Sequence, residues 1–252
     1  MKHLRLLPLA VAFILWLFDQ VFFWQAQFFY IMLALGGILI IFSIKHLVEK
    51  NKTPDWLPLI VPPILFWLAG SLYVAIIPNA VWIQTIFLVE VWLIYSYLKN
   101  LYYHLAYAAP ERIEKIDNLL LSGGFLSAFA FGSVLYGLPA FINTPFAILL
   151  LAFLPLAGLL FIQFWPYKKI NWQRKRYFFG IVVLLLMEIA AVYYFLPLNF
   201  NILGLLLALS YYFLLTITRL FWQDELKRER LKLPLIFCAL IFALVLLTSR
   251  WL

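Results

Sequence analysis

The sequence has 252 residues, of which 66% are hydrophobic and only 12% are charged. A typical soluble domain is roughly half apolar and about a quarter charged, so this composition excludes an ordinary water-soluble enzyme or binding domain. The net charge of +8 does not indicate nucleic-acid binding, because the basic residues form short clusters beside apolar runs rather than one continuous stripe. Cys238 is the one cysteine, which excludes an intrachain disulfide and a cysteine-based metal site.

The N-terminal 18 residues have the basic start and apolar centre of a signal peptide. Bulky aromatic residues follow where a cleavage site needs small ones, so we expect this segment to be kept as a first span. Further apolar runs along the chain approach the 20 or so residues that a helix needs to cross a bilayer. The predicted spans are residues 6–23, 28–44, 57–77, 80–98, 119–138, 146–165, 178–196, 202–221 and 233–248.

These runs predict helices, because every backbone polar group in lipid needs a partner within its own segment or a closed barrel. A membrane β-barrel would show alternating apolar and polar positions, and these runs do not alternate. The fold class is therefore predicted as all-α: a polytopic transmembrane helix bundle of nine spans. We expect residues 1–252 to form a single integral membrane domain with short loops and no separate soluble domain.

The basic residues predict the orientation of the chain, because Lys and Arg near span ends are retained on the cytoplasmic side. Every Lys and Arg except Arg250 falls in connectors on one side of the nine alternating spans. The N-terminus is therefore expected in the cytoplasm and the C-terminus outside. A cytoplasmic (plasma) membrane is the expected location.

The connectors on the opposite side suggest an internal repeat. Pro78, Pro139 and Pro197 each stand at the start of such a connector, 61 and 58 residues apart, and each follows a span end that contains Tyr. We expect four similar helical hairpins and a closing C-terminal helix. The alternative is that any tight turn selects Pro and Asn and any membrane interface selects Tyr.

Two features indicate how the helices pack. Pro62, Pro63 and Pro155 lie within spans and should kink them, unless neighbouring helices satisfy the carbonyls that proline leaves free. In the fifth span, small residues at four-residue spacing share one face and should allow another helix to approach closely. These residues are Gly124, Ala128 and Gly132.

The candidate intramembrane polar site consists of Glu90 and Glu188, each near the middle of its predicted span. An ionised carboxylate is costly in hydrocarbon, so we expect both to be neutral unless they meet water or a cation. They could serve as buried hydrogen-bond donors, line a substrate or ion pathway, or act as a catalytic acid or base. Asp19 and Gln20 lie nearer the outer surface, where a capped or solvated helix end is the simpler interpretation.

Two charged segments are interpreted as solvated helix extensions. Residues 110–117 carry three acidic residues at three-residue spacing, which could present oxygens to a metal and a diphosphate, but basic residues interrupt them. We therefore expect an extension of the fifth helix with a solvated face. Residues 224–230 alternate acidic and basic side chains and are expected to extend the eighth helix.

A basic and aromatic connector is the candidate contact for lipid headgroups, which attract cations and interfacial rings. Ordinary maintenance of topology explains the same charges equally well. The histidines are isolated, and no phosphate loop or nucleophile motif accompanies them, so no catalytic residue, metal site or cofactor is expected. The candidate headgroup residues are Lys168, Lys169, Trp172, Arg174, Lys175 and Arg176.

These features favour a non-enzymatic membrane protein with a structural, assembly or lipid-contacting role. The expected partners are the bilayer, with anionic headgroups at the cytoplasmic face, and another membrane protein, but no nucleic acid. The alternatives are a small-solute or proton- or ion-coupled transporter that uses Glu90 and Glu188, and a lipid-modifying enzyme. Glutamates facing a cavity would favour transport, whereas glutamates bonded singly within packed helices would favour a structural role.

Overall fold

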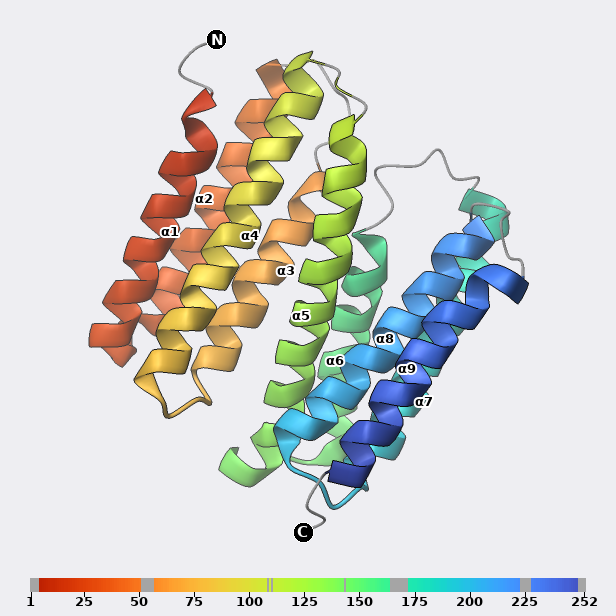
Figure 1. Ribbon diagram of the computed structural model, residues 1–252. Coiled ribbons are helices and arrows are strands. Elements are labelled where there is room, and N and C mark those ends of the chain that lie inside the picture. The colour runs from red at the N-terminus through yellow and green to blue at the C-terminus, as the bar shows by residue number, and fades with distance from the viewer. Residues whose placement is uncertain are drawn as a thin grey trace. The chain divides into compact units, whose positions relative to one another are not determined.

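The computed structural model describes residues 5–50, 57–107, 109, 111–142, 144–163, 172–222 and 228–248. This part of the chain is helical, without a strand, and confirms the predicted all-α bundle (Figure 1). Its elements are α1 (Leu7–Trp24), η2 (Ala26–Phe28), α2 (Phe29–Lys50), α3 (Leu57–Val74), α4 (Ala80–Tyr107), α5 (Glu111–Ile142), α6 (Phe146–Ile162), α7 (Trp172–Tyr194), α8 (Phe200–Trp222) and α9 (Arg228–Thr248).

Six of these helical segments are long and apolar enough to cross a membrane. They are Leu7–Trp24, Ala26–Glu49, Ala80–Tyr107, Glu111–Phe141, Tyr177–Tyr194 and Phe200–Phe221. The chain is therefore an integral, multi-pass membrane protein. The third, sixth and ninth predicted spans correspond to the shorter apolar helices Pro58–Val74, Phe146–Ile162 and Pro234–Thr248. That these three also cross, and that the N-terminus is cytoplasmic, stay predictions.

The surface of α1 shows how these helices meet lipid. Leu9 and Phe13 are each 57% exposed, whereas Val11 and Leu15, on the opposite side of the helix, are 3% and 0% exposed. Soluble proteins rarely expose continuous apolar faces of this kind. The outer face of α1 is therefore suited to acyl chains, while its inner face packs against protein.

The chain folds as two compact units, and each is described by itself. The N-terminal unit contains α1 to α4 and α5 as far as Ser127. The C-terminal unit contains α5 from Ala128, α6 as far as Phe161, and α7 to α9. The first four helices form a closed ring, because α1 packs against α2 and α4, and α3 also packs against both (Figure 1). The candidate site lies inside this ring.

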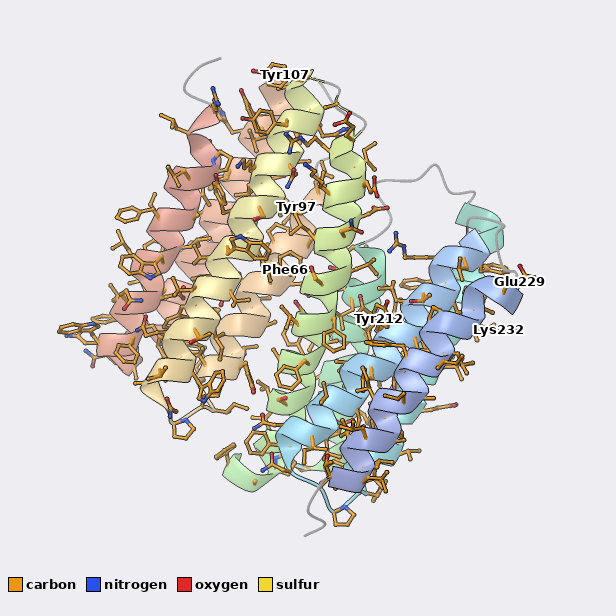
Figure 2. The ribbon with its side chains drawn as sticks, viewed as in Figure 1. Phe66, Tyr97, Tyr107, Tyr212, Glu229 and Lys232 are labelled. Carbon is orange, nitrogen blue, oxygen red and sulfur yellow. The ribbon has the colours of Figure 1, made fainter. Side chains whose placement is uncertain are left out.

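Tyr97 compensates for one of the two prolines inside α3, Pro63. Pro63 has no N–H, so the carbonyl of Leu59, four residues earlier, loses its usual helical donor. The hydroxyl of Tyr97, a fully buried residue of α4 labelled in Figure 2, donates a hydrogen bond to this carbonyl at 2.8 Å. This is the re-satisfaction by a neighbouring helix that the sequence left open, and α3 continues as one helix through Pro62 and Pro63.

Glycines permit close approach between helices in both units. Within the N-terminal unit, a Cβ at Gly36 of α2 would overlap the ring of Trp67, whose indole N–H donates to the carbonyl of Leu33 at 3.0 Å. In the C-terminal unit, a Cβ at Gly132 of α5 would lie 3.0 Å from the backbone of Gly204 in α8. The predicted close packing of the small-residue face is thus confirmed at Gly132.

Tyrosine hydroxyls also link helices within the C-terminal unit. Tyr136 of α5 donates to the carbonyl of Ala190 in α7 at 2.9 Å, and Tyr211 of α8 donates to the carbonyl of Leu160 in α6 at 2.8 Å. A hydroxyl that bonds across helices avoids the cost of an unpaired polar group in an apolar environment. Tyrosine is therefore the recurrent polar link between the buried faces of these helices.

Two predicted boundaries need correction. Pro139 was expected at the start of a connector, but α5 continues to Ile142 and contains it. The charged segment 224–230 was expected to extend the eighth helix, but its last three residues belong to α9, which begins at Arg228. Residues 223–227 lie outside the described residues. The predicted helical hairpins have partners in contact for α1 with α2, α3 with α4 and α7 with α8, while duplication itself stays a prediction.

We predict that Tyr97→Phe lowers the free energy of unfolding by about 1–3 kcal/mol, because the carbonyl of Leu59 would lose its donor in a dry environment. The measurement is reversible unfolding in mixed micelles. Tyr30→Phe is the matched control, because Tyr30 is 79% exposed. Equal effects of the two substitutions would contradict a structural role for the Tyr97 hydroxyl.

Candidate functional site

Glu90 lies inside the ring formed by α1 to α4. It stands ten residues after the start of α4 at Ala80, or about 15 Å along the helix, which is half the thickness of a hydrocarbon core of about 30 Å. Its side chain is only 3% exposed. Within the described part of the chain, neither carboxyl oxygen has a hydrogen-bond partner of good geometry. The predicted mid-span position of Glu90 is therefore also a buried one.

Asp19 is a second buried carboxyl beside Glu90. It belongs to α1, is 2% exposed, and interacts electrostatically with Glu90. Its Oδ2 atom also has no hydrogen-bond partner among the described residues. The interpretation of Asp19 as a capped or solvated helix end is wrong, because the side chain points into the ring, where α1 packs on α4.

Helix α3 provides the space that the Glu90 carboxyl occupies and a hydroxyl group beside it. A Cβ at Gly70 would overlap Oε2 of Glu90, so glycine here makes room for the carboxyl. The next residue, Ser71, is 4% exposed and its hydroxyl lies beside Glu90, although no hydrogen bond of ordinary geometry joins them in the described structure. Three helices thus direct two carboxyls and one hydroxyl into the same buried region.

A small cavity adjoins this group. Asp19 and Ser71 line it together with apolar and aromatic side chains from α1, α2 and α3. About 10 Å³ is open to the centre of a water molecule, which is roughly the smallest space that holds one water. The remaining lining residues are Phe18, Phe22, Phe29, Met32, Leu33 and Trp67.

On the side where α1 ends and α4 begins, the site continues into a pair of amides. Gln20 donates to Gln84 Oε1 at 2.9 Å, and Gln84 donates to Gln20 Oε1 at 3.2 Å. Both side chains are half-buried. The two amides lie nearer this end of the helices than the carboxyls of Asp19 and Glu90 do. Polar groups therefore extend from this end of the helices to mid-span.

The opposite side of Glu90 is apolar. The next turns of α4 place Leu93, Ile94 and Tyr97 inside, at 4%, 0% and 0% exposure. Polar contacts resume beyond them, where Arg112 of α5 donates to Asn100 Oδ1 at 3.1 Å. The site therefore has polar groups toward one end of the helices and buried, mostly apolar residues of α4 toward the other.

The chemistry of this group follows from its burial. Two ionised carboxylates without a counterion would each lose their hydration and repel one another, which costs several kcal/mol. A shared proton or a bound cation removes that cost. Ca²⁺ and Mg²⁺ take six or more oxygen ligands, and Mg²⁺ usually keeps several waters. Two carboxyls, one hydroxyl and space for about one water fit a proton or a small monovalent cation better.

Glu188 occupies a different environment. It lies on the exposed face of α7 in the C-terminal unit, whereas Glu90 points into the N-terminal unit. The two glutamates thus differ in burial as well as in unit, and their joint use in one polar cavity stays a prediction. Glu111 and Glu114 of α5 are exposed, which agrees with the predicted solvated face.

The candidate headgroup contacts also stay predictions. Lys168 and Lys169 lie outside the described residues. The other four candidates lie in the first turns of α7, but their side chains fall outside the described ones; they are Trp172, Arg174, Lys175 and Arg176.

Sequence reasoning found Glu90 but missed Asp19, Ser71 and Gln84. A hydrophobic run reports that a segment crosses, but it does not report how each helix is rotated or which helix faces it. One signal was present: Asp19 and Gln20 are consecutive polar residues in an otherwise apolar span. That pair indicated an inward polar face as well as a helix end.

No protein-family model matches the chain, and no match was found among curated proteins or solved structures.

We predict that Gly70→Ala destabilises the protein by about 1–3 kcal/mol, because the added methyl group overlaps the Glu90 carboxyl. In a Glu90→Ala background the overlap is absent, so the cost of Gly70→Ala should largely disappear. Unfolding of the four variants in a double-mutant cycle measures this coupling. Gly158→Ala is the control, because a Cβ there meets nothing within 4 Å. Additive effects of the two substitutions would show that Gly70 does not make room for Glu90.

Proposed function

We propose that this multi-pass membrane protein binds and releases a proton or a small monovalent cation at Asp19 and Glu90, and that this site couples ion movement to the transport of a small solute. The observation that carries the proposal is the burial of two carboxyls with unpaired oxygen atoms in one ring of helices. Ionisable groups in the middle of membrane helices commonly mark ion and proton pathways.

A purely structural role fits these residues less well. A carboxyl retained as a packing group should be paired, because an unpaired buried polar group costs about 1–3 kcal/mol. Here Asp19 Oδ2, both carboxyl oxygens of Glu90 and the hydroxyl of Ser71 lack such a partner within the described ranges. An exchangeable cation would satisfy several of these atoms at once.

The asymmetry of the site also supports transport. The amides of Gln20 and Gln84 form a polar approach from one end of the helices, whereas Leu93 and Ile94 close the other side. A transporter must expose its site to one side at a time. A site with polar groups toward one side and apolar residues toward the other is what a transporter should show in a conformation that opens to one side only.

An assembly role is the second candidate, and one observation favours it. Glu188 is an exposed carboxyl on an apolar face of α7. A polar group on a partner helix could hydrogen-bond to this carboxyl and so lower the free-energy cost of placing it against lipid. No observation among the described residues favours a lipid-modifying enzyme over these two roles.

Cation binding can be tested without knowing the solute. We predict that the bound ion raises the free energy of unfolding of the purified protein. If the ion is Li⁺ or Na⁺, the protein should be more stable in that cation than in choline; if it is a proton, stability should change in a pH titration. The expected gain is about 2.7 kcal/mol at an ion concentration a hundred times the dissociation constant. Asp19→Asn and Glu90→Gln should lose this dependence, because each removes one ionisable group. Glu114→Gln is the matched control, because Glu114 is an exposed carboxyl of α5.

Ion movement is then measured in proteoliposomes with a trapped pH dye and labelled Na⁺, with solute mixtures supplied on one side. Wild-type and Glu114→Gln proteins should move the bound ion, and Asp19→Asn and Glu90→Gln should not. If the free energy of unfolding of the wild-type protein depends on neither pH nor the cation, the proposed binding site is refuted. Binding without movement under any gradient or solute mixture would refute the transport role and leave a structural cation.

A further inference from the structure

Helix α7 presents one continuous apolar seam on its exposed face. Tyr177, Ile181, Leu184 and Val192 are 68%, 54%, 59% and 62% exposed, and Glu188 is exposed within the same row. Steps of three and four residues place them along one side of the helix. The opposite side is buried and packs against α8. Within the C-terminal unit, the aliphatic residues of the seam and Glu188 are therefore exposed, where lipid or another protein can contact them.

Glu188 is the one charged residue of this seam. It lies six residues before the end of α7 at Tyr194, or about 9 Å along the helix, and eleven residues, or about 16 Å, after Tyr177. Side chains of a helix lean toward its N-terminus, which turns Glu188 away from the nearer end. Reaching water along the lipid-facing side is therefore difficult for this carboxyl.

A carboxyl in this position needs a partner. Glu188 forms no hydrogen bond within the described part of the chain, and its neighbours along the seam are aliphatic. An isolated carboxylate is far more costly in hydrocarbon than a hydrogen-bonded acid. A neutral carboxyl still has one donor and one acceptor to satisfy. Lipid tails offer neither.

We propose that this face of α7 is a dimerisation surface, on which a second copy of the chain packs α7 against α7 and the two Glu188 carboxyls hydrogen-bond to each other. Two neutral carboxyls are self-complementary, because each donates to and accepts from the other. A two-fold axis sets a residue near the axis against the same residue of the partner. The occupant that best matches Glu188 is therefore another Glu188.

The rest of the seam fits the same arrangement. Rows of apolar side chains at steps of three and four residues pack between helices that cross at a small angle. A single polar residue in such a row fixes the register and the number of helices. Ile181, Leu184 and Val192 supply the packing area, and Glu188 supplies the register. This inference does not rest on Asp19 or Glu90, so either proposal can fail alone.

The test is the association constant in lipid vesicles, measured by energy transfer between labelled copies at decreasing protein-to-lipid ratios. Glu188→Leu should weaken association roughly threefold to thirtyfold, the range expected for one or two hydrogen bonds between membrane helices. Glu188→Gln should retain it, because a side-chain amide also donates and accepts. Leucine is compatible with a lipid-facing position, so the Glu188→Leu monomer should stay folded. Its unfolding is measured in parallel to check this.

Crosslinking locates the interface. In a Cys238→Ser background, Leu184→Cys on the seam should form a disulfide between copies, while Leu240→Cys, on an exposed face of α9, should not. A chain that stays monomeric at all ratios would overturn the proposal. So would crosslinking at residue 240 alone, or association that Glu188→Leu leaves unchanged. Loss of association in Glu188→Gln would show that the carboxyl meets a cationic partner instead of its own copy.

Discussion

Hydrocarbon offers no hydrogen-bond partners, and this constraint shapes the whole structure. It makes the described chain helical, since a helix satisfies its backbone internally. It also explains the most regular side-chain feature, in which tyrosine hydroxyls bond to carbonyls of neighbouring helices. Tyr97 does so where Pro63 leaves the carbonyl of Leu59 without a donor, and Tyr136 and Tyr211 do so in the C-terminal unit.

The group of Asp19, Ser71 and Glu90 departs from this rule. Their oxygen atoms are as buried as the tyrosine hydroxyls, but several have no protein partner within the described ranges. The surrounding structure accommodates them through Gly70, whose missing side chain leaves room for the Glu90 carboxyl. A buried carboxyl pair is stable only with a counterion or a shared proton. The apparent defect in hydrogen bonding is the physical basis for assigning an exchangeable ion to this site.

Much of the fold could be predicted from the sequence, because a crossing helix is specified by a local property, the length of an apolar run. The mid-span depth of Glu90 and the close packing at Gly132 followed from position and spacing alone. The burial of Asp19 did not follow, because it depends on the rotation of α1 and on its contact with α4. The end of α5 was also missed, because α5 continues through Pro139 to Ile142, and the sequence alone does not show where a membrane helix tolerates a proline.

The buried environment of Glu90 and the exposed environment of Glu188 suit different roles. Glu90 is enclosed with a second acid and is suited to an exchangeable ion, whereas Glu188 is exposed on apolar α7 and is suited to a protein partner. The central claim is that Asp19 and Glu90 together hold a proton or another monovalent cation. Infrared spectroscopy of the protein in lipid, with cation and pH exchange, measures this directly through the carbonyl band of protonated carboxyls. We predict a band that responds to pH or to Na⁺ and is lost in Glu90→Gln. A spectrum unchanged by pH, by cations and by this substitution would contradict the account.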